Sequence, residues 1–372
     1  MYIRAASTAT IDLPEKKDSG VLSWRNNKDY CFYDNGKDAL KAFLKRYKSG
    51  SKVAIQFYTC HTVLDVIKEL GCIPVFMDIC SDYFSSPLSE VKRVVEKEKV
   101  DIIIITHLFG VPNPERLIIG DYANDRKLPI IDDLCQTVGA QIDGQYLENI
   151  VDNFFYSFYI DKPVGYFNGG LLATNLFTLP NRFTRVNANG EKTLQLLKKV
   201  VSYTQSKDYR PGFNPFSRMT HMIIACDKVL SQALIEAILF SPVIIFFTRV
   251  FDKIFGHSRI FTIDELICKS IVSSLSNYDS KSRYKVLLRA SEKYNLFLPY
   301  KGIDNITCSI GSRAAVLVDD PNQTINRMRK DGYEVGLFNW KYSSVPKELH
   351  NTRELLNHII NIPTWNDSFY RV

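Results

Sequence analysis

The sequence lacks the features that mark several common classes of protein. Its eight cysteines are scattered and no two form a C-x-x-C pair, so we interpret them as reduced residues of the core or of a pocket. Lys and Arg exceed Asp and Glu by 47 − 40 = 7, but they form no basic cluster, and no nucleic acid partner is expected. Repeats and low-complexity tracts are also missing. With 45% hydrophobic and 23% charged residues, the 372-residue chain has the composition of a globular protein.

Long apolar runs are missing as well. The first 20 residues contain no apolar segment that would indicate export, and we expect a cytoplasmic protein. The most apolar stretch, AILFSPVIIFF at 237–247, has eleven residues, whereas a membrane span needs about 20. For the wider segment 237–255, which carries several phenylalanines, we favour a place in the core or in a dimer interface. A lid over the substrate and an amphipathic membrane contact are the alternatives.

Short apolar runs and amphipathic stretches alternate through the first half of the chain. The runs, rich in Val, Ile and Phe, lie at 53–57, 74–78, 101–106, 129–132, 153–159 and 170–175. The amphipathic stretches lie at 39–46, 63–70, 88–95 and 117–123. Continuous apolar strands separated by helices predict a mostly parallel sheet that is covered on both faces, in a doubly wound α/β domain.

The second half of the chain has a different pattern. Residues 176–280 are mainly helical by pattern, and their apolar segment at 228–262 diverges from the rest. After about residue 280 the sequence predicts a helix at 282–296, a strand at 314–319, a helix at 322–332 and a strand at 358–363. We therefore predict a large domain at 1–275 and a small C-terminal α+β domain at 276–372.

Polar residues follow the predicted strands where ligands of open α/β sheets bind. Asp132, Asp133 and Gln136 come after one strand, Lys162 follows the next, and Gly36 opens the first helix. A lysine can form a Schiff base with an aldehyde cofactor, and a carboxylate can keep a pyridine nitrogen protonated. A helix N-terminus with a hydroxyl group holds a phosphate. These are the requirements of pyridoxal phosphate (PLP).

Five segments resemble the DegT/DnrJ/StrS aminotransferases, which are PLP-dependent enzymes that modify sugars. The most specific are IIDDLCQTVGAQIDGQ and YSFYIDKPVGYFNGGLLATN, and the others are THLFGVPNP, YDNGKDALKAFL and GCIPVFMDI. The resemblance is continuous over about residues 30–175. It implies the PLP-dependent transferase fold of type I, the aspartate aminotransferase fold. In that fold helices flank a mostly parallel central sheet, and a smaller C-terminal α+β domain follows.

The resemblance implies a role for each of four residues. Lys162 would be the catalytic residue that forms the Schiff base and moves the proton. Asp133 would pair with the pyridinium nitrogen, and the adjacent Asp132 would be a supporting or structural residue. Gln136 would contact the phenolic oxygen of the ring, and Ser157 would donate a hydrogen bond to the phosphate.

Two positions depart from the family pattern. Gly36 and Lys37 would hold the phosphate mainly through their backbone N–H groups, but the family usually has Thr or Ser where Lys37 stands. The Lys37 ammonium could still neutralise phosphate charge. Cys60 stands where the family usually stacks an aromatic side chain on the ring. Cys60 itself could pack there, Tyr58 or His61 could supply the surface instead, and a core role for Cys60 is also open.

Three further residues complete the expected site. GFNPFSRM resembles a family segment in which Asn214 would reach the phosphate of the neighbouring subunit's cofactor, with Arg218 as a nearby cation that binds substrate. His107 would lie beside the pocket as a substrate-binding residue, or serve as a hydrogen-bonded structural residue. The resemblance thus implies a homodimer with shared active sites, and no metal is expected.

The predicted function is a PLP-dependent aminotransferase. It would move an amino group from an amino acid, glutamate by preference, to a keto-sugar carried on a nucleotide. The pathway would be the synthesis of a surface polysaccharide or an amino sugar. One alternative is a PLP-binding sensor or scaffold without catalysis, which could contact a membrane through 237–255. The other is a PLP-dependent sugar dehydratase, which is disfavoured because those relatives typically replace the lysine by histidine.

Overall fold

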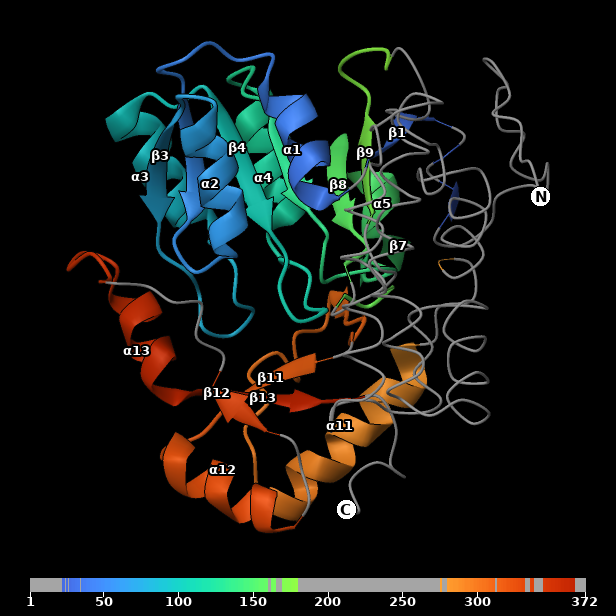
Figure 1. Ribbon diagram of the computed structural model, residues 1–372, viewed down its shortest axis with the longest axis vertical. Helices are drawn as coiled ribbons and strands as arrows, with labels where there is room; N and C mark the ends of the chain where they lie inside the picture. Colours follow the sequence, from blue (N-terminus) through green and yellow to red (C-terminus); the bar gives the residue numbers. More distant parts are fainter. Residues whose placement is uncertain are drawn as a thin grey trace, which may run out of the picture.

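A seven-stranded sheet forms the centre of the larger part of the molecule (Figure 1). The computed structural model describes residues 22–23, 25, 27–33, 35–159, 162–164, 169–179, 275, 280–311, 313–331, 335–337 and 344–364. The strands of this sheet are β1 (Asp29–Tyr33), β2 (Lys52–Gln56), β3 (Ile73–Met77), β4 (Ile102–Thr106), β5 (Ile130–Asp133), β8 (Asn153–Ser157) and β9 (Gly170–Thr174). Their order is β1-β9-β8-β5-β4-β2-β3. Strands β8, β5, β4, β2 and β3 are parallel, and β9 is antiparallel to both of its neighbours.

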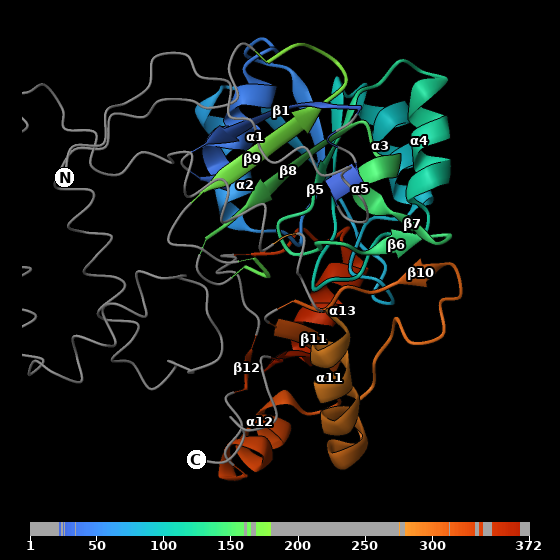
Figure 2. The same cartoon turned by 90° about the vertical axis from the view of Figure 1, so that its right-hand side faces the viewer.

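Helices cover both faces of this sheet (Figure 2). On one face lie α1 (Gly36–Leu44) and α2 (His61–Glu69), and on the other lie α3 (Leu88–Glu98) and α4 (Arg116–Asn124). Side chains of a strand alternate between the faces. Accordingly, Val53 and Ile55 pack with the cluster under α1 and α2, whereas Ala54 packs under α3 and α4. The predicted α/β fold with a mostly parallel sheet and helices on both faces is confirmed.

A small hairpin lies between β5 and β8. Its strands are β6 (Gln141–Ile142) and β7 (Gln145–Tyr146), and a one-turn helix, α5 (Leu147–Ile150), follows. Asp143 and Gly144 connect the strands with φ angles of 49° and 74°. An Asp-Gly pair with both φ angles positive is the typical two-residue hairpin connection. The sequence therefore carried a signal for this hairpin that the apolar-run pattern does not detect.

The C-terminal residues form an α+β unit across the carboxyl ends of the parallel strands (Figures 1 and 2). Its elements are α11 (Ser280–Tyr294), β11 (Arg313–Leu317), α12 (Pro321–Lys330), β12 (Gly336–Leu337), α13 (His350–His358) and β13 (Ile359–Pro363). The three strands form an antiparallel sheet in the order β11-β13-β12. A further short strand, β10 (Ile306–Thr307), pairs with β6 of the larger unit.

One buried cluster joins the two units. Tyr58, Phe84 and Phe109, from the loops that follow β2, β3 and β4, belong to the same apolar cluster as Leu287 and Val316 of the C-terminal unit. The C-terminal unit is thus held against the edge of the sheet where the predicted site residues lie. The domain boundary at 275/276 stays a prediction, and the apolar segments 228–262 and 237–255 lie outside the described residues. Among the helices that the structure describes, none has the length and apolar character that a membrane crossing requires.

Candidate active site

Asp133 is the last residue of β5 and lies beside β8, where it pairs with Phe155. Its side chain is buried, and its Oδ1 atom accepts a hydrogen bond from the backbone N–H of Cys135 at 3.0 Å. Burial raises the pKa of the Asp133 carboxyl, while the bond to Cys135, the charge of Lys162 and the nearby His107 act to lower it. A buried carboxylate in this position is stabilised by a cation placed against it.

Lys162 lies in the turn that follows β8. Its backbone N–H donates to the carbonyl oxygen of Tyr159 at 2.9 Å, which brings residue 162 back toward the end of the strand. The charge of its side chain acts to lower the pKa of both Asp133 and Cys135. The structure therefore brings together the lysine and the carboxylate that the sequence motifs single out. Their catalytic roles stay predictions.

The start of α1 packs directly against Ser157 at the end of β8. A Cβ atom on Gly36 would lie 2.6 Å from the Cβ of Ser157, closer than packed atoms come. Glycine at this position therefore lets the helix N-terminus approach the Ser157 hydroxyl group. Gly170 is needed for the same approach, because a Cβ there would lie 2.2 Å from the carbonyl oxygen of Asn35.

The first turn of α1 offers backbone donors at this point. The Oδ1 atom of Asn35 caps the helix by accepting the N–H of Asp38 at 2.8 Å. The N–H groups of Gly36 and Lys37 belong to the first turn, where a helix supplies no acceptor of its own. These two donors, the Ser157 hydroxyl group and the positive end of the helix dipole form a cradle suited to a phosphate.

The side chain of Lys37 is engaged elsewhere. Its ammonium group pairs with the carboxylate of Glu69, the last residue of α2, at 3.2 Å, and Lys41 pairs with the same carboxylate at 2.5 Å. Lys41 and Lys37 together lower the pKa of Glu69. The contribution of Lys37 to phosphate binding, which stays a prediction, would thus come from its backbone N–H group.

Cys60 precedes α2, and its Sγ atom lies 3.1 Å from the Oγ1 atom of Thr62. The side chain is half-buried and lies within electrostatic range of Cys135, two residues beyond Asp133. Of the two alternatives for a ring surface, Tyr58 is fully buried in the cluster shared with the C-terminal unit, whereas His61 is exposed. Contact between Cys60 and the ring stays a prediction.

Gln136 is oriented by the loop that follows β4. Its Oε1 atom accepts the backbone N–H of Phe109 at 3.1 Å. The other end of the carboxamide is then the NH₂ group, a donor suited to a phenolic oxygen. The C-terminal unit also approaches here, because a Cβ on Gly311 would lie 2.7 Å from the Cγ of Pro163 and 3.7 Å from the carbonyl oxygen of Gln136.

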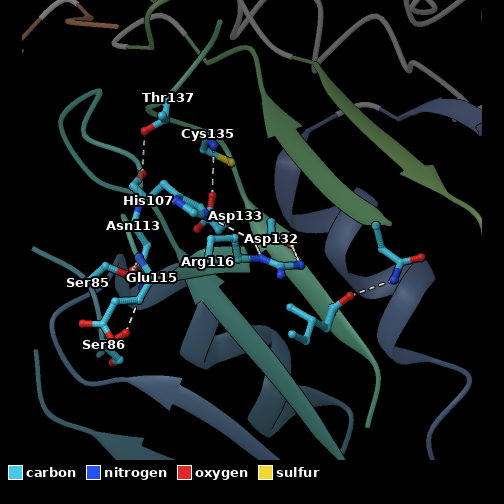
Figure 3. A network of polar contacts seen from close by, with 12 residues as sticks. Ser85, Ser86, His107, Asn113, Glu115, Arg116, Asp132, Asp133, Cys135 and Thr137 are labelled. Carbon is cyan, nitrogen blue, oxygen red and sulfur yellow. Dashed lines mark hydrogen bonds and ion pairs between the residues drawn. The ribbon is translucent and has the colours of Figure 1, made fainter. Parts of the chain in front are cut away.

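His107 is buried in a polar network next to Asp133 (Figure 3). Its ring accepts the backbone N–H of Asn113 at Nδ1 (3.0 Å), and its Nε2 atom lies 2.9 Å from Oδ1 of Asp132. Arg116 binds the same carboxylate through two nitrogens. Both ring nitrogens of His107 therefore have protein partners, which is the geometry of a residue that positions others. Substrate binding by His107 stays a prediction.

Two parts of the site differ in how far the sequence revealed them. Asn113 and Arg116 were missed: Asn113 lies in the segment THLFGVPNP but was given no role there, and Arg116 lies in no motif and reaches the site only through the fold. Asn214 and Arg218, the predicted residues of the shared dimer site, lie outside the described residues.

The motifs and the fold both match known proteins. Residues 27–229, more than half of the 372-residue chain, match the sequence model of the DegT/DnrJ/EryC1/StrS aminotransferase family. This match confirms the resemblance drawn from the motifs.

The chain is 26% identical over 141 residues to GDP-perosamine synthase of Escherichia coli O157:H7, across 38% of each protein. It is 30% identical over 146 residues to dTDP-3-amino-3,4,6-trideoxy-alpha-D-glucose transaminase of Micromonospora megalomicea subsp. nigra, also across 38% of each. The matches thus span well under two thirds of these curated relatives.

Solved structures share the fold along most of the chain. A DegT DnrJ EryC1 StrS aminotransferase from Brucella abortus has a TM-score of 0.61 at 17% identity, over 94% of this chain and 84% of that chain. A protein from Streptococcus pneumoniae described as a sugar aminotransferase, in its PLP form, has a TM-score of 0.61 at 14% identity, over 94% and 86%. The type I fold of PLP-dependent transferases is thereby confirmed.

The residues present fit pyridoxal phosphate. The cradle that glycine opens between α1 and Ser157 suits the phosphate, and the buried Asp133 carboxylate suits a protonated ring nitrogen. Lys162 supplies an amine within electrostatic range of that carboxylate. This fit agrees with the cofactor of the matched family. The family match thus confirms pyridoxal phosphate as the predicted cofactor.

Proposed function

Because the chain belongs to the DegT/DnrJ/EryC1/StrS aminotransferase family, we propose that it is a PLP-dependent sugar aminotransferase. The observation that carries the proposal is the arrangement of Lys162 and Asp133 at the ends of neighbouring parallel strands, beside the cradle formed by Gly36 and Ser157. An amine, a buried carboxylate and an anion site in one place are what transamination with this cofactor requires.

When bound, the cofactor supplies an electron sink that makes the proton on the amino carbon of the donor acidic. The protein's own groups would perform the remaining tasks. Ser157 and the N–H groups of Gly36 and Lys37 would bind the phosphate and fix its place. The Asp133 carboxylate would keep the proton on the ring nitrogen, and the Gln136 amide would donate to the phenolic oxygen.

Lys162 would carry the proton transfers. Its Nζ atom would take the proton from the amino carbon of the donor and deliver a proton to the carbon on the other side of the amino nitrogen, as a general base and then a general acid. The donor, glutamate by preference, would take up the oxygen of one water molecule, leave its amino group behind and depart as a keto acid. The same steps in reverse give the amino group to the carbonyl carbon of a keto-sugar.

The acceptor class is inferred from the relatives. Their names specify sugars carried on nucleoside diphosphates: perosamine on GDP, a 3-amino sugar on dTDP, and a 3-dehydro sugar on UDP. We propose a keto-sugar linked to a nucleoside diphosphate, used in amino-sugar or surface polysaccharide synthesis. A homodimer with shared active sites, completed by Asn214, and a cytoplasmic location belong to the same proposal.

A half-reaction tests the proposed activity. The purified protein is loaded with PLP and mixed with glutamate, and the visible absorbance of the bound cofactor and the released keto acid are followed. We expect loss of that absorbance and about one keto acid per site. Lys162→Ala should bind the cofactor but release no keto acid, and the matched control Lys97→Ala, on exposed α3 surface, should behave as the parent protein does. Cofactor binding without conversion by any amino acid would favour a sensor or scaffold instead.

A further inference from the structure

Strand β5 ends in two adjacent carboxylates, and both are buried. Asp132 is 0% exposed and Asp133 is 5% exposed, and because successive side chains of a strand point to opposite faces, the two carboxylates lie on opposite sides of the sheet. Two like charges in a poorly solvated place oppose each other's ionisation. The proposed function uses only Asp133, so the charge on Asp132 must be compensated by other groups.

Arg116 provides that compensation. It is 5% exposed, and it grips Asp132 with two hydrogen bonds, Nε to Oδ1 at 2.6 Å and one terminal nitrogen to Oδ2 at 2.9 Å. Such bidentate pairs are among the strongest charged contacts in proteins. Burial acts to raise the pKa of Asp132, but Arg116 and the hydrogen bond from His107 outweigh it and lower the pKa.

His107 ties this ion pair to the cofactor end of the strand. Because its Nδ1 atom accepts the N–H of Asn113, its ring proton lies on Nε2 and is donated to Asp132. The backbone N–H of His107 donates to the carbonyl oxygen of Asp133 at 3.1 Å. The side chain of Asn113 is fixed in turn by Ser85 at 3.1 Å (Figure 3). The pair is therefore held rigidly against the strand end that presents Asp133.

We infer that Arg116 is a positioning residue for the cofactor: it cancels the charge of Asp132, so that Asp133 keeps its negative charge for the cationic ring nitrogen. The inference rests on the proposed function, because it takes PLP as the ligand. The groups that face Asp133 are Cys135, Lys162 and His107. Loss of the Arg116 charge would expose Asp133 to an uncompensated anion on the next residue.

The test is the dissociation constant of PLP for the cofactor-free protein and four variants. Arg116→Met should weaken binding about tenfold or more, the change that corresponds to one unit of pKa at a coupled group. Arg116→Lys keeps the charge but loses the bidentate contact, so it should recover part of the affinity that Arg116→Met loses. The double variant Arg116→Met, Asp132→Asn removes both charges and should recover most of the affinity lost in Arg116→Met. Asp132→Asn alone completes the cycle and separates charge from packing.

Two readouts separate this inference from its alternatives. Inorganic phosphate, used as a competitor, should inhibit PLP binding equally in all variants, because the cradle at Gly36 and Ser157 is not altered. Circular dichroism and thermal melts identify variants that fail to fold. If the double variant binds PLP no better than Arg116→Met, the charge role is wrong and Arg116 is only structural. If the parent protein does not bind PLP, the proposed function fails as well.

Discussion

Glu148 is a buried acid with half of its carboxylate unpaired. It is 0% exposed and lies at the start of α5. Its Oε1 atom accepts the N–H of Gly139 at 2.7 Å and the hydroxyl group of Tyr156 at 2.5 Å. Its Oε2 atom is buried with no hydrogen-bond partner, one of the few such side-chain atoms in the part of the chain that the structure describes. Burial raises the pKa of Glu148 to about 7.

This residue predicts a specific dependence of stability on pH. The folded protein holds a proton on Glu148 that the unfolded chain, where the carboxyl has the ordinary glutamate pKa of 4.5, releases earlier. The raised pKa therefore stabilises the fold fully at pH values below about 4.5, and this contribution is lost as pH rises to about 7, by about 3 kcal/mol in all.

Glu148→Gln should remove this contribution to the dependence of stability on pH. Gln keeps an acceptor for Gly139 and Tyr156 but does not titrate. The measurement is the free energy of urea unfolding from pH 5 to pH 8 for both proteins. As pH rises, the unfolding free energy of the parent protein should fall relative to that of the variant. Parallel curves of unfolding free energy against pH would show that Glu148 does not titrate in this range.

At the scale of single residues, the sequence revealed those that sit in local motifs. Asp133, Gln136, Ser157 and Lys162 lie at or just after the ends of strands that the apolar runs mark, and their spacing along the chain carries the resemblance. Arg116 has no such signal. It is the first residue of α4, and only the packing of α4 beside β5 brings its guanidinium group to Asp132.

At the scale of elements, the contact between α1 and β8 decides the phosphate site. The helix is seated against the strand end only because residue 36 has no side chain, as the 2.6 Å clash of a Cβ with Ser157 shows. The helix N-terminus and the serine hydroxyl group are thus placed by one glycine, whose φ angle is not unusual. Here glycine is required for its small size.

Gly36→Ala should push α1 away from β8. We expect a loss of about 1–3 kcal/mol in unfolding free energy, the usual result of overpacking, together with weaker PLP binding. Adding Ser157→Gly removes the Cβ that the alanine meets and should restore part of the stability, because the Cα of residue 157 would still lie 3.1 Å away. PLP binding should stay weak because the hydroxyl group is gone. Urea unfolding and PLP titration of the parent protein and of these two variants test the prediction, and a fully stable Gly36→Ala protein would contradict it.

Helices and strands could be predicted from the sequence where their burial produces a regular apolar pattern. The parallel strands are buried on both faces and stand out as continuous apolar runs. Strand β1 was missed because it is a short strand, DYCFY, at the edge of the sheet as the described residues form it, where it pairs with β9. Helix α13 was missed for a different reason: its buried face is small, and its cap is supplied by another part of the molecule.

At the scale of the whole molecule, Asp78 joins the two units. It follows β3, and its carboxylate accepts the N–H groups of Asn351 and Thr352 at 2.9 and 2.8 Å and the Thr352 hydroxyl group at 2.7 Å. It thus caps the N-terminus of α13 from across the boundary between the units. Glu90 fixes it from behind by accepting its backbone N–H at 2.8 Å.

Asp78→Ala should loosen α13 and lower the unfolding free energy by about 2 kcal/mol or more, since it removes a cap and buried hydrogen bonds to a charge. Hydrogen exchange of the α13 amides should become faster. The matched control is Asp320→Ala, which removes the cap of α12 within its own unit, where Asp320 accepts the N–H of Gln323 at 2.9 Å. This control should speed exchange in α12 only. If the α13 amides of Asp78→Ala exchange as slowly as those of the parent protein, the Asp78 carboxylate does not stabilise the helix.

We propose that the amine of Lys162 holds the cofactor beside Asp133. Reduction of the PLP-loaded protein with borohydride, followed by peptide mapping, tests it most directly, because a covalent bond between amine and aldehyde becomes permanent on reduction. We predict one cofactor label per chain, on the peptide that contains Lys162, and none in Lys162→Ala. A label on another lysine, or protein that binds PLP and yields no label, would contradict the account.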